Sequence, residues 1–423
     1  MRPNQSSDRP RKSGRRTILR AAGASLAVGS LLSTAGCLSS VPALGQQVRY
    51  GEVDAPEAKS PTYRRWVPAP SEAVGERSTM DPIVFRPGEA GADEVGVRPM
   101  GGIPEALTRA RMDYFGVGFD RYETVFSYDP VIVALGSFDA ADVTETISAG
   151  PYEHADSYRD FDVYERSAPE RSVAVRDGAI LFGSAPEARP ALEAVIDARN
   201  DAERRLTATD ETFAALTDRI GLHPAVAFSA GTDADDAKAG GLLGGELGPT
   251  RGSAWSYAFD DADVYHRNLL CYERDVDLTE RRVKARLENE NEAIDAAAVA
   301  VDVDGQWLRI DLRQSHERVR DRVGDPVPAP PQITWTFDRE HESVRITHRG
   351  GDAVPASALA VGLGGGLEID ETARQFTDEY ETVADGDAIT VDTSERAGDD
   401  SVVIVHDPGD RNDRTIVGSY PLE

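Results

Sequence analysis

Cys37 ends an N-terminal region whose residue types are arranged for one kind of covalent chemistry. A basic stretch reaches Arg15 and Arg16, a weakly apolar run of fifteen residues covers 21–35, and Gly36 then precedes Cys37. A positive stretch, a short apolar run and small residues before a cleavage point are the layout of an export signal. Cleavage before Cys37 would place its thiol at a new N-terminus, where it is accessible and nucleophilic. The sequence therefore predicts export and a reactive Cys37.

Two features of this region resemble known targeting signals. Arg15 and Arg16, placed before a weakly apolar run, resemble the twin-arginine signal, which carries folded cargo. The small residues ending in Gly36-Cys37 resemble a lipobox, and in that family the cysteine sulfur takes a diacylglycerol after cleavage. The resemblance implies that the membrane is a partner through a lipid anchor at Cys37, on the outer face of the cell membrane. The alternative is an ordinary cleaved signal with an incidental Cys37.

The rest of the sequence contains no recognisable catalytic motif. Neither Gly-Lys-Ser nor Gly-Lys-Thr is present, so a P-loop is excluded, and no Gly-x-Ser-x-Gly marks a serine hydrolase. The glycines of 362–366 lack the strand–loop–helix setting of a dinucleotide site. We therefore predict no catalytic residue, no metal site and no cofactor. Seven histidines are scattered without the short spacings of a metal site: His154, His223, His266, His316, His341, His348 and His406.

Two groups of aspartates are the nearest approach to a cation site. Asp260, Asp261 and Asp263 lie close to His266, and a second group lies in the Gly-rich stretch 232–252. Carboxylate oxygens suit Ca²⁺, but neither group has the spacing of a calcium loop, and in so acidic a chain a solvated surface explains both. For the stretch 232–252 itself we expect disorder, with a functional loop as the alternative.

The charge of the chain limits its partners. The 423 residues include 74 acidic and 46 basic side chains, a formal net charge of −28, and only four lysines. This acidic, lysine-poor composition resembles that of secreted haloarchaeal proteins, in which molar salt screens the repulsion between like charges. Nucleic acid is excluded as a partner because its phosphates would be repelled. Beyond Cys37 there is one further cysteine, Cys271, which lies in an apolar run and is expected to be buried.

The pattern over residues 105–325 predicts an α+β domain. Apolar runs of strand length and helical spacings alternate, and an Asp-Gly pair between two strand patterns occurs twice, at Asp177-Gly178 and at Asp304-Gly305. Asp-Gly favours a tight hairpin because the turn needs positive φ. Strand, Asp-Gly, strand and helix thus occur twice in the same order. We interpret this as a duplication of ferredoxin-like units, each an antiparallel sheet with helices on one face, with chance convergence as the alternative.

The flanking segments differ in composition from this domain. Residues 38–104 are rich in Pro and Gly and are predicted to be a flexible tether, with Trp66 and Phe85 as anchor points onto the domain. Residues 326–331 form a proline linker. Beyond it, residues 332–423 show short alternating strands and regular turn residues, which predict an immunoglobulin-like β-sandwich.

The C-terminal segment resembles the C-terminal β-domain of haloarchaeal type IV pilins, over roughly residues 332–423. The resemblance implies a β-module displayed on the cell surface. Pilins also carry a long apolar N-terminal helix, which this chain replaces by an export signal, so filament assembly is not implied. Less specifically, residues 131–200 resemble haloarchaeal lipoproteins of unassigned activity, chiefly at Gly136-Ser137-Phe138-Asp139 and Asp162-Val163-Tyr164-Glu165. The segments that resemble the pilins are Trp335-Thr336-Phe337, 344–352, 386–391, 402–408 and Gly418-Ser419-Tyr420.

Together these observations predict a lipid-anchored extracytoplasmic surface protein without catalytic activity. Its role would be binding, adhesion or support of the envelope, with other cell-surface proteins as partners. One alternative is a secreted hydrolase whose acid–base pair is hidden among the many carboxylates. Another is a solute-binding lipoprotein, which would show two α/β lobes with a cleft between them.

Overall fold

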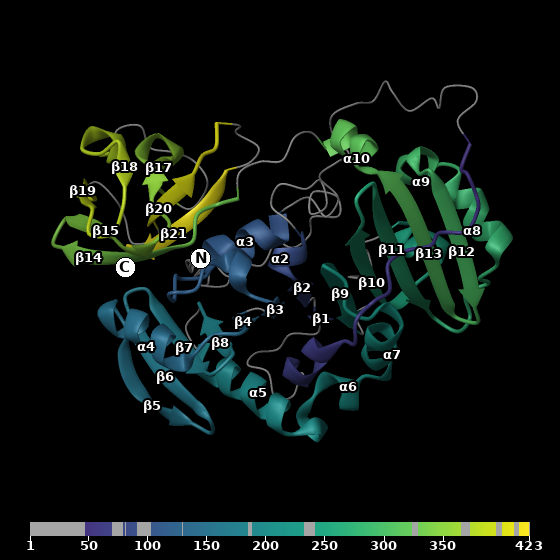
Figure 1. Cartoon of the computed structure of the whole chain (residues 1–423), viewed down its shortest axis with the longest axis horizontal. Helices are drawn as coiled ribbons and strands as arrows, with labels where there is room; N and C mark the ends of the chain where they lie inside the picture. The colour runs from purple at the N-terminus through teal and green to yellow at the C-terminus, as the bar shows by residue number, and fades with distance from the viewer. Residues whose placement is uncertain are drawn as a thin grey trace, which may run out of the picture.

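The computed structural model describes residues 47–69, 79–80, 82–90, 103–128, 130–184, 188–231, 242–323, 329–364, 373–394, 400–409 and 414–422. It contains one large antiparallel sheet with helices and, at the C-terminus, a small β-sandwich (Figure 1). The predicted α+β class is therefore confirmed. Arg15, Arg16 and Cys37 lie outside the described residues, and the proline linker is described only from residue 329. No helix among the described residues is long and apolar enough to span a membrane.

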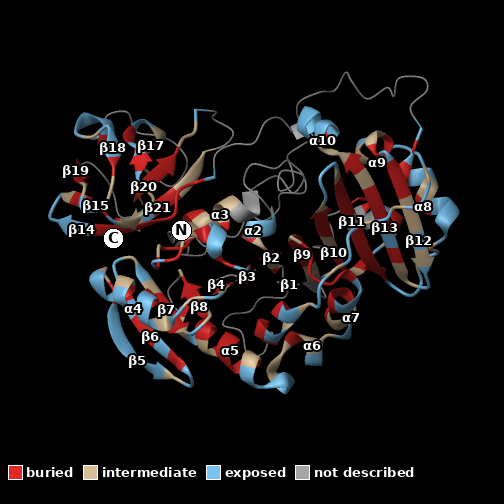
Figure 2. Cartoon of the chain, viewed as in Figure 1, coloured by how far each residue is buried: buried red, intermediate tan, exposed pale blue. Residues whose placement is uncertain are grey.

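Within the described residues, thirteen strands form the large sheet, in the order β12-β13-β11-β10-β9-β2-β3-β4-β8-β7-β6-β5, with β1 paired to β9 off this path. Its central strands are buried (Figure 2). The strands are β1 (Thr79–Met80), β2 (Ile83–Phe85), β3 (Thr124–Tyr128), β4 (Val131–Leu135), β5 (Glu153–Tyr158), β6 (Phe161–Ser167), β7 (Glu170–Arg176), β8 (Ala179–Gly183), β9 (Ala225–Gly231), β10 (Thr250–Phe259), β11 (Asp263–Tyr272), β12 (Ala298–Asp304) and β13 (Trp307–Ser315).

The helices lie before, between and after these strands. The α-helices are α2 (Pro87–Ala90), α3 (Ile103–Arg111), α4 (Ala140–Ala149), α5 (Ala188–Asn200), α6 (Leu206–Thr209), α7 (Glu211–Ile220), α8 (Glu280–Leu287), α9 (Asn291–Asp295) and α10 (His316–Val323). Short 3-10 helices are η2 (Thr62–Trp66), η4 (Phe119–Arg121), η5 (Ala202–Arg204) and η6 (Gly244–Leu247). Local sequence explains several ends. For example, the Asp210 carboxylate accepts from the N–H of Phe213, and Gly221 has a φ of 69° just after α7.

The first half of the sheet, β3 to β8, has helices on both faces. Successive strand residues point to opposite faces, and β4 is buried on both of them. Helix α4 packs on the face that includes Ile132 and Ile180, whereas α5 packs on the face that includes Val133 and Leu181. The predicted arrangement with helices on one face does not hold here, because both faces of these strands are apolar. The Asp177-Gly178 hairpin between β7 and β8 is confirmed, with a φ of 70° at Gly178.

The second half repeats the order of the first half. In each half two strands are followed by helix, and a later hairpin returns so that its last strand pairs with the second strand, giving β3-β4-β8-β7 and β10-β11-β13-β12. The first half has two additional strands, β5 and β6, between α4 and this hairpin. The second hairpin turns at Asp304-Gly305, with a φ of 60° at Gly305. Two details differ from the expected duplication of ferredoxin-like units. All strand pairs described in this sheet are antiparallel, without the parallel βαβ unit of a ferredoxin-like fold, and β9 and β2 join the halves into one sheet.

Residues 47–69 run along this domain as an N-terminal strap. Tyr50 forms a parallel bridge with Val299 of β12, and at the other end of the strap the N–H of Ala69 donates to Arg204 O at 2.8 Å. Trp66 is fully buried, as is Phe85 in β2. The prediction of a flexible tether over 38–104 is therefore wrong for 47–69 and 82–90. Apolar side chains spaced among the prolines bury in the core and order these segments.

The C-terminal residues form two three-stranded antiparallel sheets around one core. Trp335 and Ile346 from one sheet meet Val361 and Ile404 from the other. This agrees with the β-sandwich predicted over 332–423. One sheet contains β14 (Ile333–Glu340), β15 (Ser343–Gly351) and β19 (Ala388–Asp392), and the other contains β17 (Leu359–Leu363), β20 (Ser401–His406) and β21 (Thr415–Pro421). A short pair, β16 (Val354–Pro355) with β18 (Thr382–Val383), and the 3-10 helices η7 (Ala356–Ala358) and η8 (Phe376–Asp378) complete it.

Candidate functional site

The predicted functional residues fall mostly outside the described part of the chain. Arg15, Arg16 and Cys37 precede residue 47, and the acidic group in 232–241 is not described either. The stretch 242–252, for which we expected disorder, instead contains η6 and the start of β10, and Leu242 and Leu247 are buried there. The structure therefore gives no distances or contacts for the proposed lipidation site at Cys37.

The aspartates near His266 form a turn and not a cation site. Asp260 accepts hydrogen bonds from the N–H of Ala262 and Asp263 at 2.9 and 2.8 Å and from the hydroxyl of Tyr265 at 2.7 Å. These bonds, above all the one from Tyr265, lower the pKa of the Asp260 carboxyl. Among the described residues no group of three or more His, Cys, Asp or Glu side chains is arranged to hold a metal ion.

His266 belongs to a buried polar network on the sheet face covered by α9 and α10. Its Nδ1 lies 3.0 Å from Glu292 Oε1, its Nε2 lies 3.0 Å from Asn268 Nδ2, and its ring stacks on Tyr257 with centroids 4.4 Å apart. Burial would raise the pKa of Glu292, but the neighbouring His266 and Arg322 lower it overall. A histidine oriented by a carboxylate supplies two of the three members of a catalytic triad. Here the Asn268 amide occupies the ring nitrogen that a nucleophile would need.

A small pocket beneath the N-terminal strap contains His223. Val53 and Ala55 of the strap line it together with Arg267 and Asp311, and it has room for about one water molecule. Asp311 is held by Arg267 through bonds of 2.6 and 3.3 Å, so the only carboxylate lining this pocket is already paired. Burial, and then Arg267, lower the pKa of His223 to about 4. This pocket does not offer the two facing carboxylates of a glycoside hydrolase.

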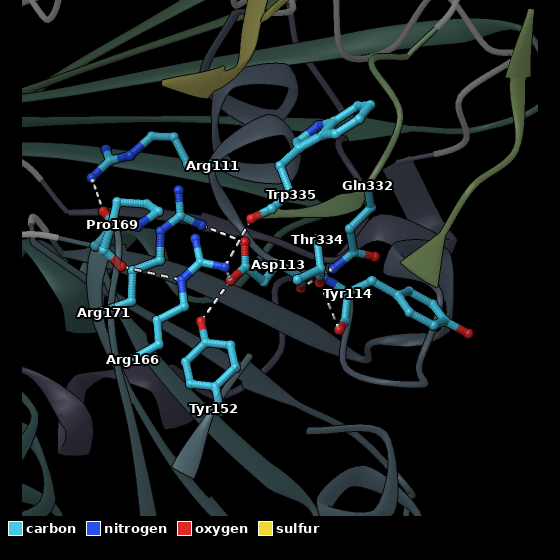
Figure 3. Close-up of polar contacts among 11 residues, drawn as sticks. Arg111, Asp113, Tyr114, Tyr152, Arg166, Pro169, Arg171, Gln332, Thr334 and Trp335 are labelled. Atoms are coloured by element: carbon cyan, nitrogen blue, oxygen red, sulfur yellow. Dashed lines mark hydrogen bonds and ion pairs between the residues drawn. The ribbon is translucent and has the colours of Figure 1, made fainter. Parts of the chain in front are cut away.

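A buried charge cluster lies where the sandwich meets the sheet; we call it the junction cluster and define it as Asp113, Tyr152, Arg166 and Arg171 (Figure 3). Asp113 follows α3, Tyr152 precedes β5, and the two arginines flank the β6–β7 turn. The Tyr152 hydroxyl donates to Asp113 Oδ2 at 2.6 Å, Arg166 lies 3.3 Å from the same oxygen, and Arg171 pairs with Oδ1. Asp113 is 2% exposed. All three side chains converge on this one carboxylate.

The junction cluster continues into the sandwich through main-chain acceptors. Arg166 donates to Trp335 O at 3.0 Å, and Gln332 Nε2 donates to Asp113 O at 3.0 Å. Thr334 Oγ1 accepts from the N–H of Tyr114 at 3.0 Å and lies 3.2 Å from Tyr114 O, to which it donates (Figure 3). These bonds join β14 to the segment after α3. The sandwich is therefore fixed to the sheet, although the proline linker predicted a separate domain.

The junction cluster binds one part of the chain to another. Burial, and then the charge of Asp113, raise the pKa of Tyr152 well above its ordinary value, so its hydroxyl remains a donor. Both Asp113 oxygens are occupied by internal donors. Sequence analysis did not single out any of these four residues. The one available signal was the pair of arginines around the short turn between β6 and β7, and nothing in the sequence indicates that they face Asp113.

The sheet itself also bears on the solute-binding alternative. That class has two lobes with parallel sheets, whereas the described strands of both halves form one continuous antiparallel sheet. Cys271 is buried, as predicted, and burial raises the pKa of its thiol. It is thus a structural residue.

Comparisons with known proteins give little further information. No protein-family model and no curated protein matches the chain. Seven chains of solved structures match, and among them are crystal forms I and IV of TP0453. Form I has a TM-score of 0.36 and 10% identity and covers 60% of this chain and 96% of that chain. Form IV has a TM-score of 0.35 and 12% identity and covers 62% and 99%. Similarity at this level supports no functional inference.

Proposed function

We propose that this protein is a lipid-anchored extracytoplasmic surface protein that acts by binding, adhesion or envelope support and not by catalysis. The observation that carries the proposal is the order of the N-terminal residues. Arg15-Arg16, a weakly apolar run and Gly36-Cys37 follow one another as in a twin-arginine lipoprotein signal. Two acyl chains on Cys37 would hold the protein firmly, because each buried CH₂ contributes about 0.8 kcal/mol.

The start of the fold adds a limit on how far the body can lie from such an anchor. Among the described residues, the first buried side chain is that of Val48, eleven residues after Cys37. Eleven residues span at most about 40 Å when fully extended. The anchor would therefore keep the folded body close to the membrane surface, in place of the long tether over 38–104 that composition predicts.

If Cys37 carries the anchor, as we propose, the position of the strap supports a particular end of the sheet as the one nearest to it. Gly51 N–H donates to Val299 O at 3.0 Å, and Val299 N–H donates to Arg49 O at 2.8 Å, so the strap begins at β12. Strands β12 and β5 are the two ends of the sheet order. In this proposal the β12 end is next to the membrane. The β5 end, whose side chains are mostly exposed, is then available to other surface components.

Replacement of Cys37 tests the proposal directly. Cys37→Ser removes the sulfur that carries the lipid, so we expect the protein to move from the membrane fraction to the medium. Cys271→Ala is the matched control, because it removes the other cysteine and should leave the protein in the membrane fraction. Mass spectrometry of the wild-type N-terminal peptide should show a diacylglyceryl group on Cys37. Unchanged membrane retention of Cys37→Ser, or an intact starting methionine without acyl chains, would contradict the proposal.

The export route has its own test. Replacement of both Arg15 and Arg16 by lysine keeps the charge of the signal but removes the arginine pair that the twin-arginine resemblance requires. We expect the uncleaved precursor to accumulate inside the cell, as detected by immunoblotting. Arg9→Lys and Arg11→Lys together are the matched control and should leave export unchanged. Equal export of the two double variants would exclude the twin-arginine route.

A further inference from the structure

Four arginines gather at the C-terminal end of α5, at the opposite end of β6 and β7 from the junction cluster. We call them the arginine patch and define it as Arg65, Arg176, Arg199 and Arg205. They come from η2, the end of β7, the last turn of α5 and the residue after η5. Such a gathering is unusual in a chain whose formal net charge is −28.

Buried aromatic rings hold three of these guanidinium groups in place. Arg65 lies 5.6 Å and Arg199 lies 5.4 Å from the centroid of the Trp66 ring, and Arg176 lies 5.5 Å from that of Phe161. The two rings meet edge to face and are 0% and 1% exposed. Cation–π contacts with fixed rings restrict the guanidinium positions without using their N–H donors. The three side chains are therefore preorganised.

The negative charge around the patch is small. Asp160 is shared, 3.5 Å from Arg176 and 3.3 Å from Arg199, and its side chain is 48% exposed. Arg205 donates to two backbone carbonyls at the end of α5, those of Ala198 and Arg199. Among the described residues, no ion pair joins Arg65 to a carboxylate. The charge of Asp177 also acts on Arg176. Two exposed carboxylates thus face four positive charges, and among the described residues only Asp160 forms ion pairs with them.

Several donors of the patch remain unused. The Nε atoms of Arg176 and Arg199 are buried and have no hydrogen-bond partner among the described residues. Burial, and then the charges of Arg199, Arg176 and Arg205, lower the pKa of Arg65. The charges repel one another and the donors are unsatisfied, so the arrangement is electrostatically incomplete as the chain alone builds it.

We propose that the arginine patch binds a tetrahedral oxyanion, a phosphate or sulfate group, with Arg65, Arg176 and Arg199 as its ligands. Guanidinium groups form paired, charge-assisted hydrogen bonds with such oxyanions. The group can belong to a free ion, to a sulfated or phosphorylated surface molecule, or to a lipid headgroup. A nucleic acid is not the ligand, because the acidic remainder of the protein would repel a long polyanion. This site goes beyond the proposed surface role and does not depend on lipidation of Cys37.

Titration of the intact protein with inorganic phosphate and inorganic sulfate tests the site, with chloride replacing them at constant ionic strength. Isothermal calorimetry should detect binding of at least one oxyanion. Arg65→Gln should weaken the affinity about tenfold through the loss of a charge-assisted contact. Arg219→Gln is the matched control. Arg219 also lies over an aromatic ring, Trp307 at 4.7 Å, but is paired with Asp304 at 3.2 Å.

Soluble glycerophosphoglycerol, titrated in the same way, identifies a lipid headgroup as the source of the phosphate. Binding of this diester alone, weakened by Arg65→Gln, supports the proposal with a lipid as the ligand. Binding of free phosphate or sulfate, weakened by the same substitution, supports it with a free or peripheral oxyanion. If none of the three probes binds, or if Arg65→Gln and Arg219→Gln have equal effects, the proposal is overturned. Arg176→Gln should reproduce the effect of Arg65→Gln.

Discussion

Strands β6 and β7 carry arginines at both ends, in two contrasting environments. At the junction cluster, Arg166 and Asp113 have side chains that are 2% and 3% exposed. At the arginine patch, Arg176 and Asp160 have side chains that are 29% and 48% exposed. The first carboxylate accepts from two arginines and a tyrosine, and the second is shared between arginines that keep unused donors.

The difference gives the same residue type a structural role at the junction cluster and, in our proposal, a binding role at the arginine patch. A buried charge must be paired, because leaving it uncompensated costs several kcal/mol. A half-exposed pair is solvated and screened, and it is worth about 0–1 kcal/mol. The junction cluster is therefore complete within the chain and holds the sandwich against the sheet. The arginine patch has an excess of positive charge over its two neighbouring carboxylates, which is why we propose an external anion there.

Asp113→Asn should break the comparison at its buried end, with the largest effect. The amide keeps the shape of the carboxylate but removes its charge, so Arg166 and Arg171 remain buried without a counter-charge. We expect the free energy of unfolding to fall by about 3–5 kcal/mol, as measured by urea denaturation. Asp120→Asn is the matched control, since Asp120 pairs with Arg109 but its side chain is 62% exposed. A loss below about 1 kcal/mol for Asp113→Asn would mean that the junction cluster is not structural.

The hairpins of this fold could be predicted because their signals are local. Asp177-Gly178 and Asp304-Gly305 each place a glycine with positive φ between two apolar strand patterns. The junction cluster could not be predicted, because its contacts join distant residues. Arg166 and Trp335 are 169 positions apart, and both lie in segments that look like ordinary strands. No periodicity relates residues at such separations, so only the packing of β14 against the sheet brings them together.

The N-terminal strap shows a second limit of sequence reasoning. Its prolines and small polar residues predicted a flexible tether. This prediction failed because an average composition hides the few apolar side chains that fix the strap to the domain. Tyr63 and Trp66 are fully buried, and the Tyr63 hydroxyl donates to Gly221 O at 3.1 Å. Trp66 was recognised as an anchor point in sequence, but the rings that meet Tyr63 and Trp66 are Phe228 of β9 and Phe161 of β6, far along the chain.

His223 sharpens the comparison, because its imidazole is buried and stays neutral, whereas the buried arginines of the junction cluster are charged and paired. Its pKa is about 4 in the folded protein, against an ordinary value of 6.5. The unfolded state therefore binds more protons between these values, and stability falls as the pH is lowered through this window. The loss should approach about 3 kcal/mol near pH 4. His223→Gln should remove this part of the pH dependence, whereas His154→Gln, at an exposed histidine, should not. Urea denaturation at pH 7 and pH 4.5 measures the difference.

If the free energy of unfolding changes equally with pH in wild type and His223→Gln, the pKa of His223 does not differ between the folded and unfolded states. The neighbouring ion pair of Arg267 and Asp311 must also remain formed over this range, because it lines the same pocket. For this reason the comparison is made between the two histidine variants at each pH, so that a contribution shared by both cancels.

Asp160→Asn tests the exposed end of the comparison and should have the smallest effect on stability. Its two ion pairs are partly solvated, so we expect the free energy of unfolding to change by less than about 1 kcal/mol. The same substitution removes the carboxylate that, among the described residues, pairs with both Arg176 and Arg199, so phosphate or sulfate should bind more tightly to the arginine patch. Urea denaturation and calorimetric titration of the same variant measure both effects. A stability loss as large as that of Asp113→Asn would show that this end is also structural, and an unchanged or weaker affinity would show that Asp160 does not compete with the ligand.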